Sequence, residues 1–383
     1  MKFFELKPEI YSESGSISYL SQIKARKALL VTDQVMINLG MVEKIDSLLR
    51  QAKTVLEVFA EVEPDPSVET IIRGVKKANE SRPDLVIALG GGSAMDVAKA
   101  IAFFQMALQK QLEPTVSDVT KPLLIAIPTT SGTGSEVTAF SVITDREKNL
   151  KIPLYDRNLI PDIAILDPDL VKTVPPVVTA DTGLDALTQA IEAYVSTQAS
   201  DYTNGLAEKS IRMIFRYLVR AYKDGDDIVA REKMHNASCM AGIAFNNAFL
   251  GLNHSMAHVL GARFHLSHGR ANAILLPYVI EYNSGSGFAR ETKKYADIAL
   301  MLGISFVNPR EGMIRLLEAI RKLNQELNIP ASLQEAGIEE EEFFADLMVI
   351  SEMALNDYCT KTNPRKPTVT EIADLFRKVY RGI

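Results

Sequence analysis

Short apolar runs that alternate with helical patterns fill the first half of the chain, and they constrain its fold more than any other feature. Four runs are predicted to be strands, at 27–33, 54–60, 84–89 and 123–127. Helical spacing of apolar residues follows at 41–51, 68–79 and 94–106. Strands that alternate with helices in this way form a mainly parallel, doubly wound sheet.

The pattern changes near Pro175 and Pro176. After Thr179 the β-rich runs become rare, and helical spacing predominates at 184–194, 203–222, 229–249, 310–327 and 341–355. We therefore expect an α/β domain at 1–178 and an all-helical domain at 179–383. A length of 383 residues agrees with two domains rather than one.

Composition and charge exclude several classes of protein. The formal net charge is −6 and no dense basic run occurs, so a nucleic-acid partner is not expected. The two cysteines, Cys239 and Cys359, lie far apart without a CxxC pair, which argues against a disulfide framework and fits a reducing compartment. The sequence has neither a signal-peptide pattern at its start nor an apolar run of about 18 residues. We expect a cytoplasmic protein without a membrane partner.

Three glycines and Ser93 follow the strand at 84–89 and open the next helix. A backbone without Cβ can approach a pyrophosphate closely, and a helix N-terminus offers free N–H groups and a partial positive charge. Ser93 can cap the helix or bond a phosphate oxygen. The spacing matches neither GxGxxG nor GxxxxGK, so a tight strand-to-helix turn is the alternative interpretation. The position after a parallel strand keeps dinucleotide binding open.

Two further segments at strand ends could contact a dinucleotide. Asp33 ends the first strand, where a carboxylate can accept bonds from ribose hydroxyls and would repel a 2′-phosphate, favouring NAD over NADP. The alternative for Asp33 is a helix or turn cap. The segment 128–136 (PTTSGTGSE) also follows a strand and carries many hydroxyls. It suits contacts to ribose, phosphate or nicotinamide, the alternative being a solvated loop.

Four of the five histidines fall within fifteen residues, at His254, His258, His265 and His268. His254 and His258 are four apart and share one face of a helix. Histidine is the commonest metal-binding side chain, so the cluster favours a metal site or a catalytic site over an incidental polar face. His235 stands alone and is interpreted as structural.

A carboxylate on an apolar helix gives a second indication of a metal. Asp185 and Gln189 are four apart in GLDALTQAIEAY, whose other positions form an apolar stripe. A buried carboxylate needs a partner, because burying it alone is costly. A divalent metal would be such a partner, and an N-cap near the helix start is the alternative.

Together these residues resemble the iron-containing (group III) alcohol dehydrogenase family. The resemblance runs from about residue 5 to the end and is carried by GGGS, PTTSGTGSE, GLDALTQAIEAY and AFNNAFLGLNHSMAHVLGARFHLSHGRANAILLP. The ending DYCTKTNPR points to the alcohol dehydrogenase half of bifunctional aldehyde–alcohol dehydrogenases and to microcompartment propanol dehydrogenases. The implied fold is an α/β N-terminal dinucleotide-binding domain plus an all-α C-terminal domain (the dehydroquinate synthase-like, iron alcohol dehydrogenase fold), with a metal in the cleft between them.

The resemblance also implies site residues. The implied metal ligands are Asp185, His254 and His268, with His258 beside the nicotinamide and the substrate. The implied cofactor contacts are Asp33, Gly91, Gly92, Ser93, Thr129, Thr130, Thr133 and Lys151. The implied substrate-pocket residues are Phe245, Leu250 and Cys359, although from the sequence alone both cysteines are also interpreted as packing residues.

One departure from the family concerns the metal. The family pattern is DALTH, with a fourth ligand histidine, and here Gln189 takes that place. A neutral amide oxygen is a poorer donor than imidazole to iron, zinc or nickel. The family implies Fe2+, and Zn2+ is the alternative, because related glycerol dehydrogenases manage with three protein ligands and zinc.

The activity implied is that of an NAD(H)-dependent oxidoreductase that acts on short-chain primary alcohols and aldehydes, with aldehyde reduction as the expected direction. A homodimer or larger homo-oligomer is implied, and association with a bacterial microcompartment is an open alternative to free cytoplasmic enzyme. Two other functions stay open. One is oxidation of a polyol, and the other is a catalytically weak paralogue that serves as an assembly subunit.

Overall fold

The computed structural model describes residues 2–112, 121–147, 150–285 and 290–382. The chain divides into two compact units, one of Leu6–Val174 and one of Pro175–Ile383 together with Met1–Glu5. The first residues thus belong to the helical unit, where the backbone N–H of Glu5 donates to Asn247 Oδ1 at 2.7 Å.

A six-stranded sheet forms the centre of the unit Leu6–Val174. Its strand order is β1-β8-β5-β4-β2-β3, and every pair is parallel, as the alternation of strands and helices predicts. The strands are β1 (Glu9–Ser12), β2 (Lys27–Val31), β3 (Val55–Phe59), β4 (Leu85–Gly90), β5 (Leu123–Pro128) and β8 (Ile163–Leu166). All of β4 is buried, which explains its continuous apolar run.

Helices cover both faces of this sheet. Alternate strand residues point to opposite faces, so Leu30 and Ile87 pack with Ile45 and Leu49 of α2, whereas Leu29 lies in the core of the other face. The helices are α1 (Gln34–Asn38), α2 (Met41–Gln51), α3 (Val68–Ser81) and α4 (Gly92–Leu112), with short 3-10 turns at η1 (Ser16–Gln22), η2 (Ser135–Val137), η3 (Arg157–Leu159) and η4 (Pro168–Val171).

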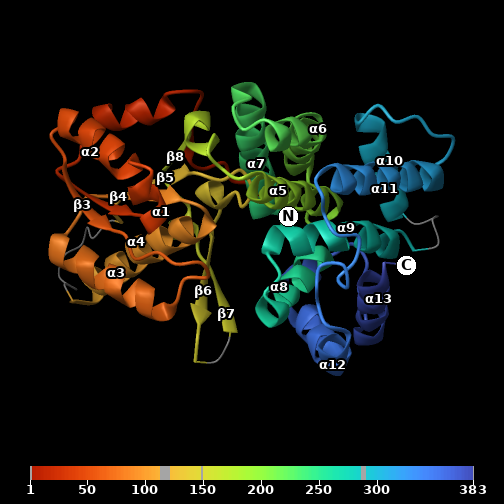
Figure 1. The fold of residues 1–383 in the computed structure, drawn as a ribbon. Coiled ribbons are helices and arrows are strands. Elements are labelled where there is room, and N and C mark those ends of the chain that lie inside the picture. The colour runs from red at the N-terminus through yellow and green to blue at the C-terminus, as the bar shows by residue number, and fades with distance from the viewer. Residues whose placement is uncertain (1, 113–120, 148–149, 286–289, 383) are drawn as a thin grey trace. The chain divides into compact units, whose positions relative to one another are not determined.

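An antiparallel hairpin of β6 (Phe140–Asp145) and β7 (Leu150–Tyr155) departs from the parallel pattern. Figure 1 shows it projecting from the body of this unit. Sequence patterning did not predict it, because the two strands are half-buried and β7 contains Pro153, which weakens a strand pattern.

The unit from Pro175 onward contains only helices among its described residues. They are α5 (Pro176–Val195), α6 (Asp201–Lys223), α7 (Ile228–Ala248), α8 (Leu252–Phe264), α9 (His268–Ser284), α10 (Arg290–Met301), α11 (Pro309–Glu326), α12 (Glu340–Asn356), the 3-10 turn η5 (Tyr358–Thr362) and α13 (Val369–Arg381). The predicted all-helical character of this region is thereby confirmed. No helix within the described ranges is both long and apolar enough to cross a bilayer.

Helix α5 packs against α6, α7 and α9, and Figure 1 shows it beside α6 and α7. Sequence spacing predicted its start at residue 184, but it begins at Pro176, whose fixed φ suits the first helical position. From Gly183 to Val195 every residue is buried. The polar side chains of this stretch therefore lie inside the helical bundle.

Candidate functional site

Helix α5 carries three buried polar side chains on one face. Asp185, Gln189 and Glu192 are only 3–5% exposed, and their spacing of four and three residues places them along one side of the helix. Burying two carboxylates costs several kcal/mol each unless they are paired or bonded. Their partners come from α8 and α9.

Asp185 is the meeting point of two histidines. Its Oδ1 lies 3.4 Å from Nε2 of His254 on α8 and 3.4 Å from Nε2 of His268, the first residue of α9. One ligand atom from each of the three residues lies within 4.8 Å of the others. His254 is buried, whereas the His268 side chain is 42% exposed, so the cluster is open on one side. Three predicted ligands are therefore brought together.

Two amides hold the Asp185 carboxylate in place. Asn272, one turn beyond His268, donates from Nδ2 to Oδ1 at 2.7 Å. Gln189 donates from Nε2 to Oδ2 at 2.9 Å. In this arrangement Gln189 fixes the carboxylate, and its own Oε1 is buried without a hydrogen-bond partner.

The cluster fits a divalent metal. Nε2 of His254 is buried and makes no hydrogen bond, and buried polar atoms are otherwise nearly always bonded. Burial lowers the pKa of His254, but the charges of Glu192 and Asp185 raise it to about 9, so the surroundings favour a cation. Two imidazole nitrogens and one carboxylate oxygen form a donor set that catalytic sites use for first-row divalent ions.

His258 belongs to a neighbouring group. Its ring stacks on that of His268, with centroids 5.3 Å apart, and its Nδ1 lies 2.9 Å from Oδ2 of Asp357. Asp357 Oδ1 accepts from the Ser255 hydroxyl and from the N–H of Cys359. Although burial raises the pKa of Asp357, the bond and charge of His258 lower it to about 2. Asp357 is thus an anionic partner for His258.

The predicted pocket residues are all buried. Phe245 lies in the last turn of α7 and is 7% exposed, and Leu250 follows in the α7–α8 connection at 6%. Cys359 is fully buried, and burial raises the pKa of its thiol well above the usual value. The thiol is therefore neutral near pH 7, which agrees with a packing role.

In the other unit, the glycine segment joins β4 to α4 in a conformation that requires glycine. Gly90 has φ of 147°, and a Cβ there would lie 2.8 Å from Cβ of Ala94. A Cβ on Gly92 would lie 2.9 Å from Cγ2 of Thr133, and one on Gly91 would contact Thr130. The loop after β5 therefore packs directly on the glycine segment at the carboxyl ends of two neighbouring parallel strands.

Asp33 reaches the same place from the end of β2. Its Oδ1 caps helix α1 by accepting the N–H of Met36 at 3.0 Å, so the capping interpretation is correct. Its Oδ2 lies 3.4 Å from where a Cβ on Gly90 would stand. One carboxylate thus caps a helix and also faces the glycine segment. Lys151, on β7, forms an ion pair with Asp65 at 2.6 Å.

A buried lysine anchors the segment after β5. Lys99 on α4 donates to Ser135 Oγ, Thr138 Oγ1 and the carbonyl of Phe140, at 2.8–3.2 Å. Ser135 in turn donates to Asp96, three residues before Lys99. Burial lowers the pKa of Lys99 to about 8, although Asp96 and Glu136 raise it. This cluster supports the neighbouring Thr129–Thr133 segment, and it was not predicted from the sequence.

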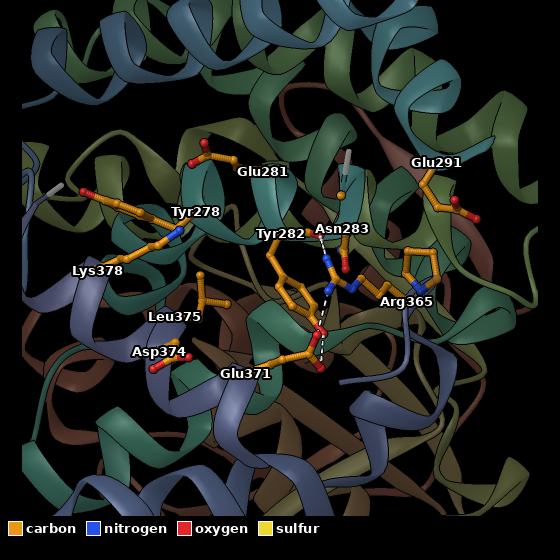
Figure 2. A pocket seen from close by; sticks show the side chains of 12 residues that line it. Tyr278, Glu281, Tyr282, Asn283, Glu291, Arg365, Glu371, Asp374, Leu375 and Lys378 are labelled. Atoms are coloured by element: carbon orange, nitrogen blue, oxygen red, sulfur yellow. Dashed lines mark hydrogen bonds and ion pairs between the residues drawn. The ribbon is translucent and has the colours of Figure 1, made fainter. Parts of the chain in front are cut away.

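A separate cavity of about 770 Å³ lies between α9 and α13 (Figure 2). Arg365 stacks on the Tyr282 ring at 4.1 Å and pairs with Glu371 at 2.6 Å. The charges of Arg365 and Glu371 are thus paired with each other. None of the predicted site residues lines the cavity.

Comparison with known proteins identifies the family. Residues 8–168 match the iron-containing alcohol dehydrogenase family, and residues 179–380 match the C-terminal part of the Fe-containing alcohol dehydrogenase family. The chain belongs to the iron-containing alcohol dehydrogenase family. The resemblance drawn from its motifs is confirmed.

Similar proteins include full-length relatives and halves of larger ones. An NADPH-dependent butanol dehydrogenase of Clostridium saccharobutylicum is 44% identical over 100% of this chain and 99% of its own. The 1-propanol dehydrogenase PduQ of Salmonella typhimurium is 40% identical over 99% and 100%. An aldehyde-alcohol dehydrogenase of Streptococcus pneumoniae is 44% identical, and the chain spans 46% of its length.

Solved structures confirm the predicted fold. The iron-containing alcohol dehydrogenase of Thermococcus thioreducens superposes with a TM-score of 0.90 at 35% identity, covering 100% of both chains. A sulfoacetaldehyde reductase of Bifidobacterium kashiwanohense, solved in complex with NAD+, has a TM-score of 0.85 at 26% identity and covers 99% of this chain and 98% of its own.

Proposed function

We propose that this protein is a metal-dependent alcohol dehydrogenase that interconverts short-chain primary alcohols and aldehydes with NAD(H). The observation that carries the proposal is the cluster of buried Asp185 and His254 with the more exposed His268, together with the unbonded Nε2 of His254. Names of full-length relatives, which include butanol and propanol dehydrogenases, support the substrate class.

Asp185, His254 and His268 would hold the ion, and Gln189 would steady Asp185 or, with its amide turned over, add a weak oxygen ligand. The family implies Fe2+, and the missing fourth histidine leaves Zn2+ as the alternative. Such an ion supplies Lewis acidity, which lowers the pKa of an alcohol and polarises an aldehyde carbonyl.

The dinucleotide would lie on the loops after β2, β4 and β5. Gly91, Gly92 and Ser93 would receive the pyrophosphate at the N-terminus of α4, which offers free N–H groups. Thr129, Thr130, Thr133 and Lys151 would contact the remainder of the cofactor. The nicotinamide supplies C4 as hydride donor or acceptor. Asp33 would accept from the ribose hydroxyls and disfavour a 2′-phosphate.

Proton transfer is assigned to His258. Asp357 accepts from its Nδ1, which leaves Nε2 to take a proton from the alcohol or return it to the aldehyde oxygen. The His258 side chain is 30% exposed, so it can exchange that proton with water. Buried Phe245, Leu250 and Cys359 offer an apolar lining that suits short aliphatic chains.

We further propose a cytoplasmic homo-oligomer that works mainly as an aldehyde reductase. The resemblance to propanol dehydrogenases supports association with a bacterial microcompartment as the alternative location. No nucleic-acid or membrane partner is proposed.

The test is turnover of propanal with NADH by protein stripped of metal and then given Fe2+ or Zn2+. Activity should depend on the ion, and His254→Ala should lose both bound metal and most activity while still binding NADH. His265→Asn is the matched control, because His265 is exposed and stands outside the cluster. Metal-free turnover, or full activity in His254→Ala, would contradict the proposal. Oxidation of glycerol in preference to propanol would shift the substrate class to polyols.

Cofactor choice is tested separately, since the butanol dehydrogenase relative is named for NADPH. The wild type should show a higher kcat/KM for NADH than for NADPH, and Asp33→Gly should narrow the difference. A wild type that uses both cofactors equally would show that Asp33 does not select the cofactor.

A further inference from the structure

Glu192 contacts two consecutive residues of α8 at once. It is 5% exposed and stands on the same face of α5 as Asp185, two turns further along. Its Oε2 lies 2.5 Å from Nδ1 of His254, and its Oε1 accepts the backbone N–H of Asn253 at 2.7 Å. One carboxylate thus joins the ring of a proposed metal ligand to the backbone just before it.

Helix α8 depends on distant side chains for its N-terminal cap. Its cap residue is Gly251, which has no side chain to offer. Instead, Asn363 accepts the N–H of Leu252 at 3.1 Å, and Glu192 accepts that of Asn253. A Cβ on Gly251 would stand 2.8 Å from Glu192 Oε1 and 2.9 Å from Asn363 Oδ1. Glycine at this position therefore lets both acceptors reach the start of the helix.

The carboxylate also decides which ring nitrogen of His254 carries a proton. An ionised carboxylate can only accept hydrogen bonds, so Nδ1 must be the donor in the short contact. The lone pair available to an ion is then that of Nε2, the nitrogen that faces Asp185 and makes no hydrogen bond. Such a fixed choice of nitrogen raises the strength of an imidazole ligand.

We propose that Glu192 is the positioning residue of the metal site, fixing both the α8 N-terminus and the Nδ1–H form of His254 so that Nε2 is presented to the ion. The inference rests on the proposed metal site at Asp185, His254 and His268. It assigns to Glu192 a role distinct from that of Asn363, which caps the same helix but bonds Asn283 and Arg365 rather than the His254 ring.

Glu192→Gln tests this role with almost no change of shape. A glutamine has one acceptor oxygen, so it can serve the Asn253 N–H or His254 Nδ1–H, but not both. If its oxygen caps the helix, its NH2 group faces Nδ1, which must then accept, and the proton moves to the nitrogen that should bind the ion. Either orientation damages the site.

The measurement is the Zn2+ dissociation constant from competition with a chelator. Glu192→Gln should bind Zn2+ about 10- to 100-fold more weakly than the wild type. Glu192→Asp keeps an acceptor-only group and should recover part of the loss. Asn363→Ala removes the other half of the cap and also the bonds of Asn363 to Asn283 and to the carbonyl of Arg365, yet it should bind Zn2+ nearly as tightly as the wild type.

A second readout does not depend on affinity. In the Zn2+-loaded wild type, the short bond to Glu192 should shift the Nδ1 proton of His254 far downfield, and this resonance should be missing from Glu192→Gln. With only five histidines, labelled imidazoles can be assigned one by one. Circular dichroism of the metal-free variants checks folding, and Glu192→Asp supplies the comparison if the Gln variant does not fold.

The outcomes separate the two proposals. Equal Zn2+ affinity in Glu192→Gln and wild type would overturn the positioning role. An equal loss of Zn2+ affinity in Asn363→Ala would also overturn it, because capping alone would then explain the effect. A Glu192→Asp variant that binds Zn2+ no more tightly than Glu192→Gln would overturn it as well. A wild type that binds no Zn2+ or Fe2+ would instead refute the metal site itself.

Discussion

Each unit contains a cluster with buried carboxylates that need partners, and the two clusters obtain those partners in different ways. Around Lys99 the chain supplies its own cation, and three acceptors satisfy its three N–H donors. Around Asp185 the chain supplies carboxylates and imidazoles but no fixed positive charge, and Nε2 of His254 and Oε1 of Gln189 have no hydrogen-bond partner. The Lys99 cluster has its hydrogen bonds filled by the chain itself, and the Asp185 cluster leaves donor atoms that suit the ion we propose.

The difference teaches how to separate structural from functional buried charge. Both clusters contain carboxylates that would be costly to bury alone. A lysine from the chain is a permanent partner, whereas the exchangeable ion that we propose at Asp185 would make the stability of that cluster depend on solution conditions. Substitutions and ligands should therefore act differently on the two.

The largest expected effect is on the Lys99 cluster. Lys99→Met leaves the buried Asp96 without its cation, which should lower the free energy of unfolding by about 3–5 kcal/mol. Urea denaturation measures this change in the free energy of unfolding. Lys110→Met on the same helix is the control, since Lys110 is exposed. Equal denaturation midpoints for both variants would break the comparison, because the lysine would then not be needed as a counter-ion.

A pH effect should follow from Glu136 in the same cluster. Burial raises its pKa to about 7, although a backbone hydrogen bond and Lys99 lower it, so between pH 4.5 and 7 the folded state holds a proton that the unfolded state has lost. Stability contributed by this group is therefore present below pH 4.5 and lost as pH rises through 7, by about 3 kcal/mol. As pH rises from 4.5 to 7, the free energy of unfolding of Glu136→Gln should increase relative to that of the wild type. Denaturation at several pH values measures this difference. Parallel curves would refute the assignment.

Added metal should act on the Asp185 cluster alone. Free Zn2+ at 100 times its dissociation constant should stabilise the wild type by about 2.7 kcal/mol. The gain should vanish in His254→Ala, which lacks a proposed ligand, and persist in Lys99→Met, which keeps Asp185, His254 and His268 unchanged. Differential scanning calorimetry with and without metal measures the gain, and its loss in Lys99→Met would show that the two clusters are not independent.

The smallest effect concerns the fourth ligand position. Gln189→His should tighten metal binding about tenfold, or ~1.4 kcal/mol, because imidazole donates to first-row ions more strongly than an amide does. Chelator competition on both proteins gives the ratio. If the wild type holds its ion as tightly as the variant, the amide completes the cluster as well as a histidine would, and the Asp185 cluster is less incomplete than we conclude.

Local pattern predicted much of the fold. The apolar run of β4, the glycines after it and the parallel sheet follow from sequence spacing alone. Helix α9 escaped prediction because it is buried on nearly all sides and contains Pro277, so neither an amphipathic stripe nor a clean helical run marks it. Burial on all sides is a property of the packed bundle and has no local periodic signal.

The site was only partly predictable for a related reason. Clustered histidines stand out because the residue is rare, so His254 and His268 could be proposed as ligands. Glu192, Asp357 and Lys99 are common charged residues that resemble solvated surface positions until packing shows Glu192 and Lys99 buried and the Asp357 side chain only 18% exposed. Glu192 had one signal, its place on the same helical face as Asp185. The direction in which the Gln189 amide points depends on Asp185 and could not be deduced from sequence.

Helix α9 approaches α5 so closely at Gly269 that a Cβ there would lie 2.0 Å from the carbonyl oxygen of Asp181. Ser267 and Arg270 on either side both bond the Asp181 carboxylate. Two helix backbones, rather than the ion, therefore set the spacing between Asp185 and His268, and the first turn of α9 should exchange its amide hydrogens equally slowly with and without metal. A metal site whose ligand spacing is fixed by the backbone cannot select its ion by changing its geometry. The ion that the protein carries will follow from donor chemistry and from which metal the cell supplies, so iron starvation should yield zinc-filled protein of unchanged backbone geometry.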